Sequence, residues 1–487
     1  MTAGPTTTPH ATPRTRSPLL GGPYRTVTLG MVALITLAAF EALAVTTAMP
    51  IVAAELGGLS LCAMAFAGPV ATGVVGMVGG GLWTDRVGPA RPLLTGVGVF
   101  AAGLVVAGTA GSMATVVAGR VLQGLGAGML IVAVYVVVAR VYPDELRPRV
   151  FAAFAAAWVL PSVVGPALAG VVAESLGWRW VFLAVPVLAL PAVLAVRPTL
   201  RTLGSSTTPA GRRPAPGPTA DAPDASDAPE AVGTTPPAPA RRRRPPLLLA
   251  VVAGSGALLL HWAGQQDDAV RASGLAVGAV AVGLTLPGLV PPGTLRAARG
   301  LPTVVLVRGL LGAAFFAAEV YLPLLLTSVR GLRPAQAGLA LTGAALAWSA
   351  GSWLRGRHDA WDAGRVVRAG AATIAVGTAV AAAAVLPAVP VAASIAGWSL
   401  AGLGMGLTYP TLSVLTLRLS PPAQQGANSS ALQVMESLTI AVVLAVSGPL
   451  FVLLLARDAT TAFVTAFAVA GAFAVAGLAV GGRVRAA

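Results

Sequence analysis

Long apolar runs recur along almost the whole chain, and short polar segments separate them. Many of these runs exceed the roughly 18 residues that mark a membrane-spanning helix. Stretches that alternate apolar and polar positions, as an outer-membrane barrel requires, do not appear in the pattern. The pattern predicts an all-α polytopic membrane protein with fourteen spans, at residues 26–51, 60–82, 92–110, 113–139, 150–173, 178–197, 247–263, 272–290, 301–327, 335–354, 366–386, 391–417, 428–455 and 459–482.

Composition supports this class of protein. Of the 487 residues, 56% are hydrophobic and only 10% are charged, whereas soluble proteins carry about 25% charged residues. Cys62 is the only cysteine, so neither a disulfide nor a thiolate metal site is expected. The chain has no lysine, which excludes a Walker-type nucleotide loop, and it shows no catalytic Ser/His/Asp set. We therefore expect neither an enzyme nor a bound cofactor or metal.

The distribution of arginine predicts the orientation in the membrane. All 32 basic residues are arginine and the formal net charge is +15. An even number of spans places both termini on one side, and the loops on the other side hold few arginines. The positive-inside rule then puts both termini in the cytoplasm of a plasma-membrane protein. Since the arginines act as topology signals in this reading, no nucleic-acid partner is expected. The arginines expected outside are Arg179, Arg271, Arg330, Arg333 and Arg457.

Segments rich in proline, alanine, serine and threonine divide the chain into parts. Nothing in residues 198–246 can bury a core, so this stretch is expected to be a disordered cytoplasmic linker, with the run Arg241–Arg244 held against anionic lipid headgroups. The spans then group as six, an extra hairpin, and six. The expected parts are an N-terminal tail 1–25, a bundle 26–197, the linker, a transmembrane hairpin 247–290, a second bundle 301–482 and a tail 483–487.

Three glutamates fall well inside the predicted spans. Glu41 is the only charge in LITLAAFEALAVTTAMP, and Glu319 and Glu436 lie in the spans 301–327 and 428–455. An ionised carboxylate at this depth costs several kcal/mol unless it is paired or faces water. Such residues are therefore functional candidates, as are their polar neighbours Tyr321 and Gln433, of which Gln433 shares a helical stripe with Glu436.

One of these acids has a predicted partner. In GRVLQGLGAG, Arg120, Gln123 and Gly124 share one helix face. Arg120 and Glu41 both lie about 12–15 Å from the outer ends of their spans, so the two side chains can pair. Burial penalises the ionised carboxylate while a nearby arginine favours it, and a group balanced in this way can take up and release a proton. We therefore hypothesise that Glu41 titrates on a wet passage. A permanent ion pair that only fixes packing is the alternative.

The loop GLWTDRVGPARP carries a family resemblance. It resembles the loop between helices two and three of the major facilitator superfamily, and the resemblance implies that its aspartate latches the outward-closed arrangement of the two halves. The helix start near Asn428, with its partial positive charge, is the expected partner of Asp85. The fit rests on Gly81, Asp85, Arg86, Gly88 and Arg91.

Two further segments resemble parts of the same superfamily. GRVLQGLGAG is similar to an R-x-x-Q-G pattern associated with proton-coupled members. WVLPSVVGPALAG, with Gly165, Pro166 and Gly170, resembles the helix-packing signature of drug antiporters, although Pro161 stands where glycine is more usual. Small residues there are expected to allow close helix approach. ESLGWRWVF and the fourteen spans resemble the fourteen-spanning drug:proton antiporter branch.

The resemblance implies a transporter that works by alternating access as a monomer, driven by the proton gradient and exporting amphiphilic or cationic small molecules of the multidrug or antibiotic type. Its partners are then the substrate, protons and membrane lipid. Glu319 and Glu436 are second candidates, as proton sites or as counter-charges for a cation. Three alternatives stay open: a proton symporter for a small metabolite, a lipid or glycolipid transporter, and a membrane sensor or scaffold that transports nothing.

Overall fold

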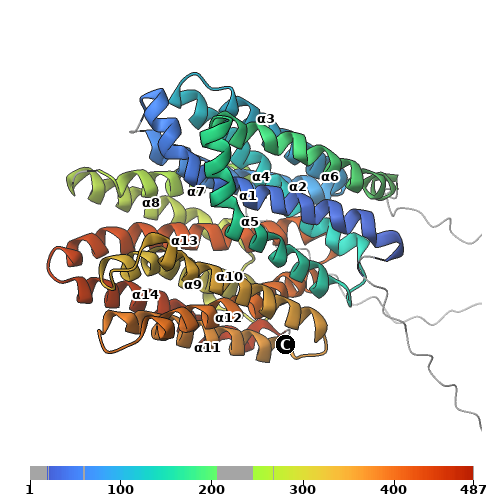
Figure 1. Ribbon diagram of the computed structural model, residues 1–487. Coiled ribbons are helices and arrows are strands. Elements are labelled where there is room, and N and C mark those ends of the chain that lie inside the picture. Colours follow the sequence, from blue (N-terminus) through green and yellow to red (C-terminus); the bar gives the residue numbers. More distant parts are fainter. Residues whose placement is uncertain (1–18, 20, 59–60, 206–244, 267, 486–487) are drawn as a thin grey trace, which may run out of the picture.

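The computed structural model describes residues 19, 21–58, 61–205, 245–266 and 268–485. Within these ranges the chain forms fourteen long α-helices joined by short turns, and no strand (Figure 1). Their bounds are α1 Arg25–Leu56, α2 Cys62–Val87, α3 Ala90–Gly108, α4 Met113–Val141, α5 Arg147–Ser175, α6 Arg179–Ser205, α7 Pro246–Ala263, α8 Asp268–Leu289, α9 Leu301–Ser328, α10 Pro334–Arg357, α11 Ala363–Ala382, α12 Val391–Arg418, α13 Gln425–Leu455 and α14 Ala459–Val480.

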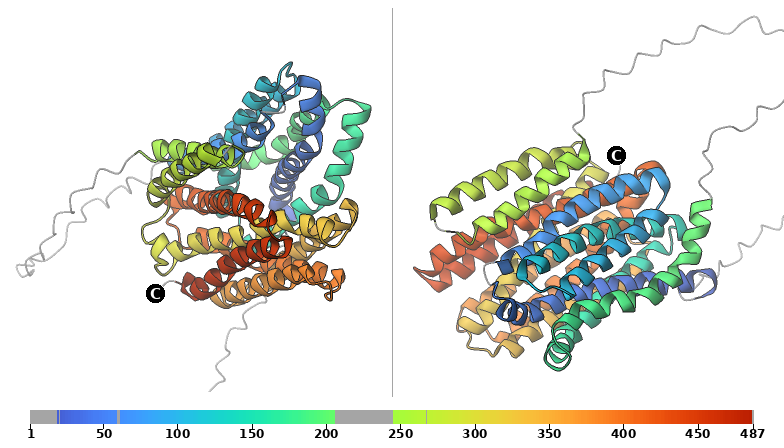
Figure 2. Two further views of the ribbon diagram at one scale, coloured as in Figure 1. Left: turned by 90° about the vertical axis from the view of Figure 1, so that its left-hand side faces the viewer. Right: turned by 90° about the horizontal axis from the view of Figure 1, so that it is seen from above.

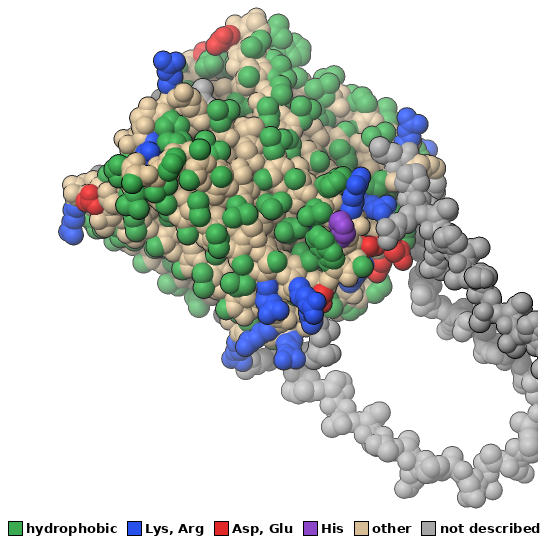
Figure 3. All heavy atoms as spheres, turned by 60° about the horizontal axis from the view of Figure 1, so that its bottom comes forward, with side chains coloured by type: hydrophobic (Ala, Val, Ile, Leu, Met, Phe, Trp, Pro, Cys, Tyr) green, Lys and Arg blue, Asp and Glu red, His purple; other side chains and the backbone are tan. Residues whose placement is uncertain are grey.

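Length and apolarity make this a multi-pass membrane protein. In the described part of the chain, thirteen of the helices are long and apolar enough to cross a membrane. The remaining one is α10, the least apolar of the long helices, which packs against α12 and α5. Apolar side chains cover the broad face of the molecule, and charged side chains gather towards its edges (Figure 3). The predicted all-α fold with fourteen spans is confirmed.

The helices pack as two groups of six with a hairpin beside them. In the first half, α4 packs against α2 and α3, and α1 packs against α5 and α6. In the second half, α12 packs against α10 and α11, and α9 packs against α13 and α14. The helices α7 and α8 pair with each other, and α7 rests on α2 and α13 (Figure 2). The hairpin therefore covers the seam between the halves on one face.

The ends of the described chain mark one side of the membrane protein. The start of α1, the end of α6, the start of α7 and the last described residues all lie on this side (Figures 1 and 2). We call it the termini side and the opposite one the far side. Odd-numbered helices of the first half and of the second half start on the termini side and run to the far side, so residue numbers along each helix give depth at about 1.5 Å per residue.

Several helices extend beyond the predicted spans, as α1 ends at Leu56 instead of residue 51 and α2 ends at Val87 instead of residue 82. The helix α6 continues through Pro198 to Ser205 instead of ending at residue 197, because Leu200 is buried and holds this last part against the core. The helix α13 starts at Gln425, three residues before the predicted start. Most of the predicted tail 1–25 and linker 198–246, including Arg241–Arg244, lies outside the described residues.

Close backbone contacts fix α4 at the centre of the first half. A methyl group added at Gly128 would lie 2.2 Å from the carbonyl oxygen of Gly73 on α2, and one added at Gly126 would lie 2.2 Å from the backbone nitrogen of Phe100 on α3. Only glycine permits this approach on both sides of the helix. The polar residues of α4 are therefore held in a defined position between its neighbours.

Candidate functional site

A buried polar network joins α1, α2 and α4 inside the first half. The Arg120 guanidinium donates from Nη1 to Glu41 Oε1 and to Gln123 Oε1, and Gln123 Nε2 donates to Glu41 Oε2. Arg120 Nε also donates to the carbonyl oxygen of Ala65, at 3.1 Å. The i, i+3 spacing on α4 brings Arg120 and Gln123 to one carboxylate. The predicted ion pair of Glu41 with Arg120 is present.

The network also corrects an expectation. Glu41 is 3% exposed, and both of its carboxylate oxygens accept hydrogen bonds. In this arrangement protein encloses Glu41, so the side chain does not line the wet passage expected from the sequence. The physical reason is that one arginine and one amide on the same face of α4 satisfy the whole carboxylate. The pair is electrically neutral, which makes its burial in the membrane tolerable.

A second buried network lies in the other half. Arg308 on α9 donates from Nε to Glu436 Oε2 on α13 at 2.6 Å, and from Nη2 to Gln433 Oε1 at 3.3 Å. The Tyr409 hydroxyl on α12 donates to Glu436 Oε1 at 2.5 Å, and the Arg308 guanidinium lies 3.5 Å from the centre of the Tyr409 ring. Glu436 is thus neutralised within its own half, as Glu41 is in the first.

Two members of this second network were not selected from the sequence. Arg308 is an arginine inside an apolar run, and that signal alone could have marked it, because such residues are rarely unpaired. Tyr409 gave no signal, since a tyrosine within an apolar helix usually packs. Room for the network comes from Gly312, where an added methyl group would lie 3.1 Å from Glu436 Cγ and from the Tyr409 hydroxyl.

Glu319 differs from the other two acids. It lies on α9, about three turns beyond Arg308, and its side chain is half-buried. Among the described residues it has neither a hydrogen bond nor an ion pair. Its neighbour Tyr321, predicted to line the cavity, is instead packed between helices: its hydroxyl lies 3.0 Å from Ser447 Oγ, and its ring packs at a tilt against Phe451. Tyr321 is therefore a packing residue in this arrangement.

The predicted contact of Asp85 with the start of α13 is present. Asp85 Oδ1 accepts from the backbone N–H of Gly426 at 2.6 Å, and Oδ2 accepts from the backbone N–H of Ala427 at 2.8 Å. Free N–H groups at a helix start bind anions well. Gly81 permits the approach, because a methyl group there would lie 2.6 Å from the carbonyl oxygen of Gly426. This contact joins the two halves.

The contact of Asp85 lies at one end of the molecule. The end of α2 and the start of α13 lie on the termini side, so the contact holds that side closed. Which side of the membrane this contact closes depends on the orientation of the termini, so the expected outward-closed role stays a prediction. Other contacts between the halves lie on the same side: Arg418 pairs with Asp144 at 3.6 Å, and Arg149 Nε donates to the carbonyl oxygen of Gly356 at 3.4 Å.

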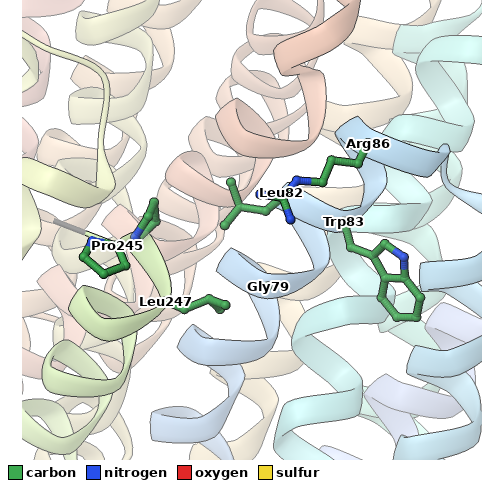
Figure 4. A pocket seen from close by; sticks show the side chains of 7 residues that line it. Gly79, Leu82, Trp83, Arg86, Pro245 and Leu247 are labelled. Atoms are coloured by element: carbon green, nitrogen blue, oxygen red, sulfur yellow. The ribbon is translucent and has the colours of Figure 1, made fainter. Parts of the chain in front are cut away.

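The remaining residues of the loop have separate places. Gly88 takes a φ of +84°, a conformation that favours glycine and allows the turn into α3. Arg91 is exposed on the first turn of α3. Arg86 borders a pocket of about 360 Å³ in which Leu82 and Leu247 project into the space between α2 and α7 (Figure 4). No acid lines this pocket, so it is separate from the buried networks.

The antiporter-like segment in α5 does not show the expected close packing. A methyl group at Gly165 would lie 3.7 Å from Phe40 Cδ2, which is an ordinary contact, and one at Gly170 would meet nothing within 4 Å. Pro166 is exposed, as are the neighbouring side chains Val163 and Leu168. The reason is that the far part of α5 packs on α1 through one face, where Ala169 and Ala173 are buried, and leaves the face of Val163 and Leu168 exposed.

Comparisons with known proteins agree with this architecture. A 172-residue segment is 31% identical to Multidrug resistance protein 3 of Bacillus subtilis, covering 35% of this chain and 34% of that protein. A 153-residue segment is 29% identical to the multidrug transporter protein MdtP of the same organism, covering 31% of this chain and 28% of that protein. The matches thus span about a third or less of the relatives' own length.

Solved structures show the same fold at low identity. A bacterial homologue of the iron transporter ferroportin in an outward-facing state has a TM-score of 0.63 at 13% identity, covering 94% of this chain and 97% of that chain. The proton:xylose symporter XylE has a TM-score of 0.61 at 14% identity, covering 93% and 94%. The family model of the Major Facilitator Superfamily matches residues 30–444. Because this match covers most of the sequence, the chain belongs to the major facilitator superfamily.

Proposed function

We propose that this transporter is a proton-coupled exporter of amphiphilic or cationic small molecules in the plasma membrane, with both termini in the cytoplasm. The observation that carries the proposal is the buried network of Glu41, Arg120 and Gln123 at mid-depth in the first half. Similarity to two Bacillus multidrug proteins supports export of such compounds. The arginine-poor far-side loops support the orientation.

The network supports a coupling mechanism. A proton on Glu41 removes the negative charge that Arg120 neutralises, so protonation weakens the link between α1 and α4. An ion pair in a low-dielectric site responds strongly to this change. With the proposed cytoplasmic termini, the contact at Asp85 closes the inner side, and the proton then comes from the outer side. Loss of the proton on the inner side then restores the pair and resets the carrier.

The proton gradient is sufficient for export. One pH unit supplies about 1.4 kcal/mol per proton, and the membrane potential adds roughly 2.3 kcal/mol per 100 mV. Together these sustain more than about a hundredfold gradient of a neutral substrate for each proton. One proton that moves down its gradient in each transport cycle therefore provides enough energy.

Purified protein in liposomes provides the test. A panel of fluorescent cationic and neutral compounds is followed during an imposed pH gradient and, separately, during substrate exchange without a gradient. We expect Glu41→Gln to lose gradient-driven transport and to keep exchange, because exchange needs no net proton movement. Glu55→Gln is the matched control, since Glu55 pairs with Arg179 at the exposed far side. Full gradient-driven transport by Glu41→Gln would refute the coupling role.

A further inference from the structure

A proline inside α2 leaves one backbone carbonyl group without its usual helical donor. Pro69 lies in the far-side part of this helix and has no N–H group. The carbonyl oxygen of Ala65, four residues earlier, therefore cannot accept the helical hydrogen bond from residue 69. Ala65 is fully buried. A carbonyl group freed by proline within a membrane helix needs a donor from a neighbouring element.

Arg120 supplies this donor from α4. Its Nε donates to the carbonyl oxygen of Ala65 at 3.1 Å, while its Nη1 donates to Glu41 and to Gln123. The guanidinium is thus held by two kinds of partner on neighbouring helices. The carboxylate on α1 loses its charge when it takes up a proton, whereas the backbone carbonyl on α2 does not titrate.

Close packing keeps the freed carbonyl and the arginine at the same level. A methyl group added at Gly124 would lie 2.3 Å from both the Cα and the carbonyl oxygen of Pro69, so α2 and α4 meet backbone to backbone at the proline. Thr72 Oγ1 also donates to the carbonyl oxygen of Val121 at 2.7 Å, one residue after Arg120. These contacts hold the two helices in a fixed register beside the network.

The second partner matters when the carboxylate is neutral. Arg120 is 6% exposed, and within the described part of the chain Glu41 is the carboxylate that pairs with it. A proton on Glu41 therefore leaves a buried guanidinium without its counter-charge, which is strongly unfavourable. The hydrogen bond to Ala65 does not depend on that charge, so it persists in both protonation states of Glu41.

We propose that Pro69 is a positioning residue: it frees the carbonyl of Ala65, and this carbonyl keeps Arg120 in place while Glu41 is protonated. The inference rests on the proposed proton coupling at Glu41 and adds how the arginine is retained through the cycle. Because Arg120 stays beside the neutral carboxyl group, the ion pair re-forms when the proton leaves.

Thermal unfolding of the purified full chain in three backgrounds tests the proposal. Pro69→Ala restores the N–H group at residue 69, which binds the carbonyl along the axis of α2 and takes it from Arg120. The unfolding temperature should fall by about 2 °C or more further in a Glu41→Gln background than in the wild type, because Arg120 has no counter-charge there. In a Glu41→Gln, Arg120→Met background it should rise, since the freed carbonyl then lacks a donor and Pro69→Ala supplies one.

Pro191→Ala is the matched control. Pro191 is an exposed proline inside α6 of the same half, and among the described residues no side chain donates to the carbonyl of Val187, four residues earlier. Its effect should be equal in all three backgrounds. A proline that only bends α2 would likewise give equal shifts everywhere, and that result for Pro69→Ala would overturn the proposal. If the background without both charges does not fold, the comparison of wild type with Glu41→Gln decides.

Substrate exchange in liposomes gives a second measurement. Exchange by Glu41→Gln should fall about tenfold when Pro69→Ala is added and stay unchanged when Pro191→Ala is added. An equal effect of the two proline substitutions would also contradict the positioning role. Failure of the proposed coupling is observed separately, as full gradient-driven transport by Glu41→Gln, because unfolding and exchange are measured without a proton gradient.

Discussion

Replacing Asp85 with asparagine tests how the termini side is held closed. The carboxylate accepts two backbone hydrogen bonds from the start of α13, at 2.6 and 2.8 Å. Asparagine keeps one acceptor oxygen, places an amide N–H group against the second donor, and removes the charge that favours a helix start. The loss of one charge-assisted bond amounts to about 2 kcal/mol. This corresponds to roughly a 30-fold shift towards arrangements with the termini side open.

Reaction of a buried cysteine with maleimide measures this shift. Ser413 on α12 lies 3.3 Å from the Tyr135 hydroxyl of the other half and is 2% exposed. In a Cys62→Ala background, Ser413→Cys reacts only when the halves separate there. We expect Asp85→Asn to raise the reaction rate by roughly 30-fold when opening is fast relative to labelling, because the rate then follows the open population.

Asp362→Asn is the matched control for this experiment. Asp362 is also an aspartate on the termini side, and it accepts from the backbone N–H of Arg365 at the start of α11, at 2.8 Å. Its other partner is Arg485, so both contacts stay within the second half. The control should leave the labelling rate of the buried cysteine unchanged. If Asp85→Asn labels no faster than this control, the contact at α13 does not hold the termini side closed.

Two further substitutions test packing and charge. Gly426→Ala would place a methyl group 2.3 Å from the carbonyl oxygen of Gly81. It should therefore also speed labelling of Ser413→Cys. An unchanged rate would show that α2 and α13 accommodate the methyl group without opening the termini side. Glu436→Gln leaves Arg308 buried without a counter-charge and should cost about 3–5 kcal/mol, seen as a lower thermal unfolding temperature. The double variant Glu436→Leu with Arg308→Met should recover most of that loss, and equal melting of the single and double variants would contradict the charge argument.

The features that could be predicted from the sequence are those that the bilayer itself enforces. A spanning helix must be apolar over its length, so the number of spans followed from hydropathy alone. Depth follows from residue number along a helix, and this was sufficient to pair Glu41 with Arg120. The contact between Asp85 and the start of α13 was predictable because both lie where helices end on one side.

The features that could not be predicted depend on how each helix is rotated and tilted. Hydropathy does not say which neighbour a side chain meets, so Tyr409 was missed and Tyr321 was placed in a cavity although it packs against Phe451. The same limit applies to Gly165 and Gly170, because Gly165 faces Phe40 of α1 at an ordinary distance and Gly170 meets nothing within 4 Å, which depends on how α5 is rotated against α1. Helix α10 is the least apolar of the long helices, and it packs against α12 and α5. Its place in the bundle therefore depends on packing more than on its own apolarity.

The placement of charge explains how such a molecule can change shape inside a membrane. Each buried ion pair joins helices of one half only, so moving one half against the other exposes neither pair to lipid. The contacts that must break lie at one end, and of these the pair between Arg418 and Asp144 is exposed and contributes about 0–1 kcal/mol. The Asp85 contact is therefore the main polar barrier to opening the termini side. Each half can then move as a rigid body within which its own buried ion pair stays enclosed.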